Sequence, residues 1–113
     1  MKFYLSSKIH KATVTDANLD YIGSVTIDMT LIKLAGFELG EKVSVWDITN
    51  GERLETYVME GEENSGTICL NGAAAHKIQV GDEIIIAGFT LADKPVQPKI
   101  VLVDEKNNFK QFL

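Results

Sequence analysis

Apolar and polar residues alternate in short segments along most of this chain, a pattern typical of half-buried β-strands. The clearest segment covers residues 42–49, where Val43 and Val45 flank a serine. Asn50-Gly51 follows it, a pair that favours a hairpin turn, so residues 53–59 are expected to form the return strand. The same pattern predicts strands at residues 9–15, 22–27, 67–70, 83–89 and 99–103. We therefore expect a mainly β protein.

Two short helices are expected between the strands. Asp28 is a good N-cap for a segment at residues 29–35, and Gly36 can end that helix in the left-handed conformation. A second short helix is expected after Asn71-Gly72, through the small residues that follow. The helical content is therefore predicted to be low.

A similar sequence follows each of these two helical segments. Residues 39–45 (LGEKVSV) resemble residues 80–86 (VGDEIII), because each has an apolar residue, a glycine, an acid, a charged residue and then a strand. Such turns are common, so coincidence and two related halves are both open explanations. Two related halves would fold into one barrel, and closing a barrel removes the exposed edges of a small open sheet.

Size and composition fit one compact domain. The chain has 113 residues, of which 45% are hydrophobic and 24% charged. A domain of this size buries a limited share of its surface, so oligomerisation is a reasonable expectation. The formal net charge is −5 and no block of Lys or Arg occurs, so nucleic acid and anionic membranes are not expected as partners. A small anionic substrate would need a local basic pocket.

Cysteine content and the chain ends bear on location. Cys69 is the only cysteine, so no intramolecular disulfide can form and a reducing cytoplasmic setting fits best. The first eight residues lack the apolar stretch of a signal peptide, and the longest apolar run, residues 84–89, is too short to span a bilayer. We expect a single domain over residues 1–113, with residues 105–113 as a flexible tail.

Several short motifs go beyond a fold class. They are Lys8-Ile9-His10, Tyr21-Ile22-Gly23-Ser24, Trp46 to Gly51, Arg53, Thr56-Tyr57 and Asn71 to His76. In this order and spacing, up to about Phe89, the chain resembles the aspartate 1-decarboxylase family. The Tyr-x-Gly-Ser and Asn-Gly-Ala-Ala-Ala-His segments are specific in combination, although neither is specific alone.

The resemblance implies a fold, a reaction and a cofactor. The fold is a double-psi β-barrel, and the assembly is a homotetramer with active sites between subunits. The chain cuts itself between Gly23 and Ser24, and Ser24 becomes a covalent pyruvoyl group that replaces a bound cofactor. L-Aspartate forms a Schiff base with this group and is converted to β-alanine and CO2, which supplies pantothenate and coenzyme A synthesis.

The Gly23-Ser24 pair suits this chemistry, although the dipeptide alone favours a simple bend in a strand, and only the surrounding family pattern reverses that interpretation. Decarboxylation of an amino acid leaves a carbanion, which needs an electron-accepting carbonyl that no side chain provides. Attack by the Ser24 hydroxyl on the Gly23 carbonyl gives an ester, and elimination and hydrolysis then give a pyruvoyl group. Gly23 leaves that carbonyl uncrowded. The resemblance assigns Thr56 as donor to the developing oxyanion, and a plain strand residue is the alternative.

Substrate recognition is assigned to basic residues elsewhere in the chain. Arg53, the only arginine, has a planar fork that matches a carboxylate. Lys8 adds a second positive charge. The alternative for both is a solvated surface cation.

The resemblance gives the remaining site roles to one tyrosine and to one small-residue segment. Tyr57 is the acid that protonates the α-carbon after CO2 leaves, and the alternative is an aromatic residue packed in the core. The amides of Asn71, Gly72, Ala73 and Ala74, together with Thr56, form a polar cradle for the substrate. Asn71 is also in place to cap the helix that starts there, and the two roles are compatible.

Two alternatives remain open at the level of sequence. One is a non-catalytic barrel that binds a small ligand or a protein partner and stays uncut at Ser24. The other is a pyruvoyl-dependent decarboxylase of a different substrate, which Arg53 and Lys8 disfavour because a monocarboxylate needs less positive charge.

His10 and His76 lack a metal-type spacing, so no metal is expected. His76 is interpreted as structural, and the role of His10 stays open. Whether cleavage needs a maturation partner is also open.

Overall fold

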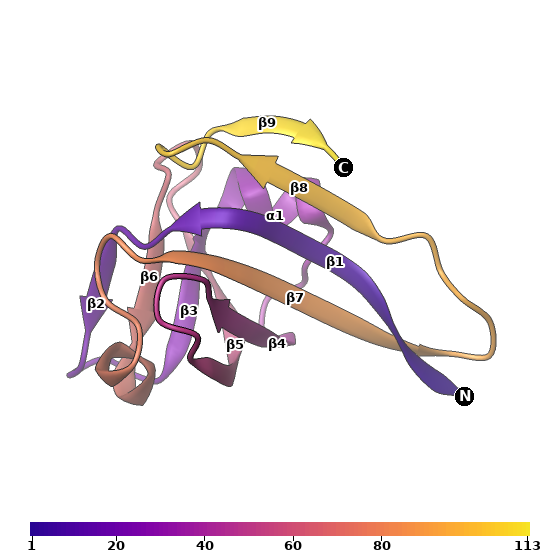
Figure 1. Ribbon diagram of the computed structural model, residues 1–113, viewed down its shortest axis with the longest axis horizontal. Coiled ribbons are helices and arrows are strands. Elements are labelled where there is room, and N and C mark those ends of the chain that lie inside the picture. The colour runs from indigo at the N-terminus through magenta and orange to yellow at the C-terminus, as the bar shows by residue number, and fades with distance from the viewer.

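A computed structural model describes residues 1–113, and most of the backbone is strand (Figure 1). In chain order the elements are β1 (Lys2–Thr13), β2 (Asp16–Asn18), β3 (Ser24–Asp28), α1 (Met29–Ala35), β4 (Lys42–Asp47), β5 (Arg53–Gly61), β6 (Ile68–Asn71), the 3₁₀ helix η1 (Gly72–His76), β7 (Glu83–Ala92), β8 (Lys99–Val103) and β9 (Phe109–Phe112). The prediction of a mainly β protein with short helices is confirmed.

The strands form one sheet that closes on itself. Its order is β2-β6-β3-β5-β4-β7-β1-β8-β9. Because β1 and β2 are consecutive parts of one N-terminal segment, the neighbour of β7 is joined to the neighbour of β6, and strands β1 to β7 complete a barrel. Closure leaves no free edge inside the barrel. β8 runs parallel to β1 on the outside, and β9 pairs antiparallel with β8.

The two similar sequence segments occupy matching places in this barrel. One half contains β3, α1 and β4, and the other contains β6, η1 and β7. Equivalent strands pair with each other, because β3 is antiparallel to β6 and β4 is antiparallel to β7. Val45 lies opposite Ile86, the residue at the same position of the similar sequence. This symmetry supports two related halves. Together with the parallel pairs β3–β5 and β2–β6, these antiparallel pairs make up the predicted double-psi β-barrel.

The hydrophobic core fills the barrel. It is one cluster of buried residues contributed by β1, by β3 to β8 and by α1. In β3 the core residues are Val25 and Ile27, and in β6 they are Ile68 and Leu70, all with no exposed surface. Because strand side chains alternate between two faces, the residues between these four point away from the core. That outer face of β3 and β6 carries the site.

Helix α1 has the ends that the sequence predicts. The Thr30 N–H donates to Asp28 Oδ1 at 2.8 Å, and Gly36 ends the helix with a φ of 79°. Asp28 is only 3% exposed, and its carboxylate also accepts the N–H groups of Asn64 and Gly66, each at 2.9 Å. One buried carboxylate therefore holds both the start of α1 and the loop before β6.

The second helix corrects one expectation. η1 is a short 3₁₀ helix, and Asn71 stands at its N-cap position with extended backbone. The Asn71 side chain makes no capping hydrogen bond. The predicted capping role of that side chain is wrong, because its amide group points to β3 instead.

β4 and β5 form the predicted antiparallel hairpin, and only its loop is longer than expected. β4 ends at Asp47, two residues earlier than expected, and residues 48–52 form a longer loop. Asp47 Oδ1 accepts the N–H of Thr49 at 2.8 Å and that of Asn50 at 3.1 Å. The turn therefore closes on a side chain, as aspartate turns commonly do, and the strand ladder stops before the Asn50-Gly51 pair.

An arm projects from the barrel and carries the N-terminus (Figure 1). It is formed by residues 1–6 and 89–98, where β1 and β7 pair beyond the barrel wall. β1 starts at Lys2 and not at residue 9 as predicted, because β7 gives it a partner along its whole length. The arm exposes Phe3 (72%) and Leu91 (51%), which offers an apolar surface to another molecule.

The C-terminal residues form a strand of their own. β9, within the segment predicted to be a flexible tail, pairs with β8, and all four of its side chains are exposed. The Asn107 side chain before it is buried and donates from Nδ2 to the Thr13 and Gly66 carbonyls at 2.8 Å each. These bonds attach the start of the segment to the barrel.

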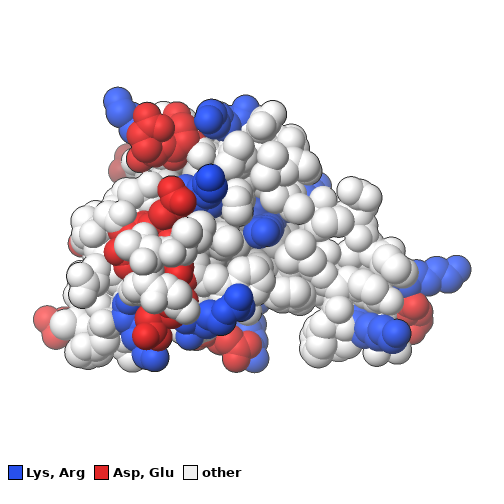
Figure 2. All heavy atoms as spheres, in the orientation of Figure 1, with Lys and Arg blue, Asp and Glu red and all other residues white.

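The surface charges are mixed. On the face shown in Figure 2, Lys and Arg side chains are interspersed with Asp and Glu and form no continuous basic area. No helix of the structure has the length and apolar character needed to cross a membrane.

Candidate active site

Ser24 is the first residue of β3 and is held by two hydrogen bonds. It is 1% exposed, although Gly23 before it is exposed. Its hydroxyl donates to the Ile22 carbonyl at 3.2 Å and accepts from Asn71 Nδ2 at 2.9 Å. Ser24 and Asn71 are direct partners in the β3–β6 pair. The predicted reactive serine is therefore positioned by the opposite half of the barrel.

The backbone at Gly72 passes Gly23 at a distance that only glycine allows. A Cβ atom on Gly72 would lie 2.7 Å from Gly23 Cα and 3.1 Å from the Tyr21 carbonyl oxygen. Gly72 also has a φ of 68°, which residues with side chains rarely adopt. Both constraints reserve this position for glycine and set the start of η1 against the predicted cleavage point.

A cavity of about 410 Å³ brings six of the predicted site residues together. Its lining consists of Gly23, Thr56, Tyr57, Asn71, Ala73 and Ala74, with Leu54, Glu55 and Lys77. In the parallel β3–β5 pair, Val25 lies opposite Val58. The same register, continued backwards, sets Thr56-Tyr57 beside Gly23-Ser24. Motifs from three separate segments therefore meet at the Gly23–Ser24 bond.

The two predicted basic residues lie outside this cavity. Lys8 is half-buried in β1, opposite Ala87 of β7. Arg53 begins β5, and its guanidinium carbon lies 4.9 Å from the Trp46 ring centre, a cation–π contact. Neither residue forms an ion pair within the chain. Within one copy of the chain, these two charged side chains therefore do not line the cavity beside Ser24. Both are available to bind a carboxylate.

Two residues outside the predicted set touch the site. Asn71 Nδ2 also donates to Thr26 Oγ1 at 3.0 Å, and the Cys69 thiol donates to Asn71 Oδ1 at 3.2 Å. Thr26 and Cys69 are partners across the β3–β6 pair, and each lies two residues along its strand from Ser24 or Asn71. The alternation of side chains along a strand could have pointed to Thr26 and Cys69, because residues two apart lie on the same face of the strand.

Lys77 is a third residue that the motifs did not select. It lines the same cavity, and its Nζ lies 3.1 Å from Glu52 Oε2. Its charge is therefore already compensated at the cavity wall. No sequence signal distinguished this lysine from the other surface lysines.

The structure gives His10 an unpaired nitrogen. Its Nδ1 is buried and has no hydrogen-bond partner. Burial lowers the pKa of His10, and the charges of Lys8 and Lys11 lower it further, against an opposing effect of Glu83. His10 is therefore mostly neutral at pH 7.

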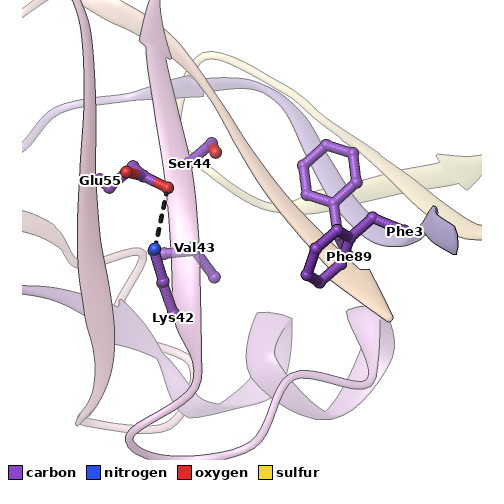
Figure 3. A pocket seen from close by; sticks show the side chains of 6 residues that line it. All are labelled: Phe3, Lys42, Val43, Ser44, Glu55 and Phe89. Carbon is purple, nitrogen blue, oxygen red and sulfur yellow. Dashed lines mark ion pairs between the residues drawn. The ribbon is translucent and has the colours of Figure 1, made fainter. Parts of the chain in front are cut away.

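A second cavity, of about 380 Å³, lies where the arm meets the barrel (Figure 3). Its lining consists of Phe3, Lys42, Val43, Ser44, Glu55 and Phe89. Lys42 Nζ lies 3.3 Å from Glu55 Oε2, so the two charges there compensate each other. Paired charges and exposed rings suit contact with an apolar surface better than binding of a dicarboxylate, so this cavity is not the candidate site.

Comparisons with known proteins agree with the geometry. The family model described as aspartate decarboxylase matches residues 1–110. An aspartate 1-decarboxylase from Caldicellulosiruptor bescii is 58% identical over 107 residues, which cover 91% of this chain and 84% of the relative. One from Wolinella succinogenes is 53% identical over 117 aligned positions, which cover 99% of this chain and 97% of the relative.

Among solved structures, the computationally designed protein msDPBB_sym2 is similar to this chain. The alignment covers 75% of this chain and 96% of the design, with a TM-score of 0.43 and 17% identity.

Proposed function

We propose catalytic roles for individual residues of this chain. The chain belongs to the aspartate decarboxylase family, because the family model matches residues 1–110 and relatives are more than 50% identical. As a member, it is an aspartate 1-decarboxylase, an enzyme that removes CO2 from aspartate. One observation carries the residue roles: the buried Ser24 hydroxyl accepts a hydrogen bond from Asn71 and follows a glycine against which Gly72 packs.

Ser24 first cuts its own chain. Its Oγ attacks the Gly23 carbonyl carbon, the peptide C–N bond breaks, and the hydroxyl proton passes to the Ser24 nitrogen, which gives an ester. Loss of the Ser24 α-proton and breakage of the Cβ–Oγ bond release residues 1–23 as a carboxylate and leave dehydroalanine. Addition of water and loss of ammonia leave a pyruvoyl group on residues 24–113. Thr56, set beside Gly23 by the strand register, is the proposed donor to the carbonyl oxygen under attack.

The residues around Ser24 fit such a group. A pyruvoyl group supplies the electron-accepting carbonyl that decarboxylation requires. Gly72 lets the start of η1 pack directly on Gly23, and the small side chains of Ala73 and Ala74 line the cavity. Tyr57 lines the same cavity, and its phenol is the proposed proton donor to the α-carbon after CO2 leaves. Asn71 and the backbone of residues 72–74 complete the substrate cradle.

Binding of the aspartate carboxylates requires charge that one chain does not bring to the cavity. Lys8 and Arg53 are the proposed clamps, and both are free of ion pairs. We place them at the site from a neighbouring copy, in a homotetramer with sites between subunits. The arm supports this assembly, because it exposes Leu91 and also Phe3, which lines the cavity of Figure 3.

Removal of the α-carboxylate from L-aspartate yields β-alanine, which serves pantothenate and coenzyme A synthesis. We propose a cytoplasmic location, because the single cysteine, Cys69, forms no disulfide and suits a reducing compartment.

Intact mass under denaturing conditions tests the cleavage. Mature protein should give two species, residues 1–23 and residues 24–113 with a pyruvoyl end. Ser24→Ala should remain one chain and produce no β-alanine. A mature, unsubstituted chain that stays uncut, or a Ser24→Ala variant with normal activity, would refute the serine-derived group.

Mixed tetramers test the shared site. Arg53→Ala alone should be cut normally but should use aspartate poorly, with kcat/KM reduced by about tenfold or more. Ser24→Ala chains carry an intact Arg53. Co-expression of the two variants should therefore restore part of the activity, because some sites combine a cut chain with an intact arginine. Mixtures without activity, despite proven mixed assembly, would place Arg53 outside a shared site.

A further inference from the structure

The outer face of the β3–β6 pair carries a hydrogen-bonded group of four side chains, the polar quartet: Ser24, Thr26, Cys69 and Asn71. Ser24 lies opposite Asn71, and Thr26 lies opposite Cys69. The core residues of both strands alternate with these four, so all four project to the same side. Asn71 is the centre of the quartet, because it contacts each of the other three.

Asn71 uses both ends of its amide. Nδ2 donates to Ser24 Oγ at 2.9 Å and to Thr26 Oγ1 at 3.0 Å, and Oδ1 accepts the Cys69 thiol at 3.2 Å. A side-chain amide can turn by 180°, which exchanges its donor and acceptor ends. In the turned state the NH2 group would face sulfur, a weak acceptor, and Ser24 would lose its donor. At 3% exposure, water cannot easily replace the missing partners.

We propose that Thr26 and Cys69 are positioning residues for self-cleavage, because they hold the Asn71 amide with its NH2 end on Ser24 Oγ. This inference rests on the proposed function, since it concerns the formation of the pyruvoyl group. Neither residue touches the bond that breaks. Each acts through Asn71, one at the acceptor end of the amide and the other at the donor end.

The Asn71 NH2 group acts on the same oxygen in both bond-breaking steps. In the first step it holds Ser24 Oγ in place for attack on the Gly23 carbonyl carbon. In the second step the Cβ–Oγ bond breaks, and Oγ leaves as part of the Gly23 carboxylate with its electron pair. A donor already aimed at this oxygen stabilises the charge that develops there without any rearrangement.

The thiol is suited to its role. Burial raises the pKa of Cys69, and the Asp16 carboxylate raises it further. Cys69 therefore keeps its proton at pH 7 and remains a donor to Asn71. Thr26, half-buried in the same layer, offers its hydroxyl oxygen as acceptor.

Cleavage rates of matched variants test the inference, with the uncut fraction followed by intact mass. Cys69→Ala removes the donor, and Thr26→Val removes the acceptor at constant shape. Each should slow cleavage by about threefold to tenfold, and the double variant by more, as expected for loss of one or two hydrogen bonds. Cys69→Ser and Thr26→Ser keep a hydroxyl and should cut within about twofold of the unsubstituted chain.

Rescue by serine distinguishes positioning from packing. If folded Cys69→Ala and Thr26→Val were cut as fast as the unsubstituted chain, the inference would be wrong. Cys69→Ser as slow as Cys69→Ala, with both folded by circular dichroism, would also overturn it, because the thiol would then act through its volume. If Cys69→Ala fails to fold, the Thr26→Val and Thr26→Ser pair still decides. An unsubstituted chain that is never cut would instead refute the proposed function itself.

Discussion

The two halves of the barrel place a buried polar residue at the same point and use it differently. β3 ends at Asp28 before α1, and β6 ends at Asn71 before η1. Both residues are 3% exposed. Asp28 accepts three backbone N–H groups and so holds the helix start and a neighbouring loop. Asn71 caps nothing, and its amide donates to Ser24 and Thr26.

The local structure reflects this difference. The capped segment forms a regular α-helix that Gly36 ends, whereas the uncapped one forms a short 3₁₀ helix. A side chain that bonds to Ser24 is not available to cap the helix start, so the helix beside the proposed reactive serine is less regular. Of these two matching residues, Asp28 therefore serves stability, and Asn71 serves the serine at the start of β3.

Exchange of Asp28 or Asn71 for alanine should separate the structural role from the catalytic role most strongly. Asn71→Ala should slow self-cleavage by about 100-fold, because the donor to Ser24 is lost. It should lower the free energy of unfolding by about 1–2 kcal/mol, because the Ser24 hydroxyl keeps its bond to the Ile22 carbonyl and no backbone N–H loses its acceptor. Asp28→Ala should lower the free energy of unfolding by about 3 kcal/mol or more, because three buried N–H groups lose their acceptor, while the folded protein is still cut. Urea denaturation of uncut chains and intact mass measure the two effects.

A matched pair makes this prediction sharper. Asp28→Asn keeps one acceptor oxygen and should be destabilised less than Asp28→Ala. If Asp28→Ala slowed cleavage of folded protein as much as Asn71→Ala does, the division of roles between Asp28 and Asn71 would be wrong.

The glycines beside these residues should differ next. Gly72→Ala should lower the free energy of unfolding by about 2–4 kcal/mol and abolish cleavage, because the new Cβ would lie 2.7 Å from Gly23 Cα. Gly36→Ala, at a φ of 79°, should cost only about 1 kcal/mol and leave cleavage unchanged, because the nearest atom is Lys99 Cδ at 3.7 Å. Thermal melting and intact mass measure both. Normal cleavage by Gly72→Ala would contradict the packing of Gly72 on Gly23.

Asp47 is a buried carboxylate with only one satisfied oxygen, and its predicted effect is confined to the pH dependence of stability. Oδ1 accepts from Thr49 and Asn50, and Oδ2 has no hydrogen-bond partner. Burial raises the pKa of Asp47 from its ordinary 3.8 to about 6, and the Asp82 carboxyl adds to the rise. Because the folded pKa is the higher one, the stability that Asp47 contributes is complete below about pH 3.8 and is lost as the pH rises through about 6.

Asp47→Asn removes this pH dependence. The stability that the Asp47 carboxyl loses between acidic and neutral pH corresponds to about 1–3 kcal/mol, at 1.36 kcal/mol per pKa unit. The variant should match the unsubstituted chain at pH 4 and be more stable at pH 7.5, as measured by urea denaturation at both pH values. An equal difference at both pH values would contradict the raised pKa.

Local signals in the sequence predicted local structure well. The cap at Asp28 and the stop at Gly36 bound α1 as expected, because both contacts join residues close together in the chain. The hairpin at Asn50-Gly51 is also confirmed, although the Asp47 side chain closes its loop earlier than expected. The arm was not visible in the sequence, because β1 extends only where β7 supplies a partner.

The sequence alone determined the motifs, the resemblance to a family, the first helix and all strands except β2 and β9, and it singled out Ser24. Tertiary structure alone decided which residues meet. Ser24 and Asn71 are 47 positions apart and become partners through the register of β3 against β6. That register also selects Thr26 and Cys69, and it turns Asn71 from a helix cap into a donor. Caps and turns depend on a few neighbouring residues, whereas cross-strand contacts depend on how the whole barrel closes.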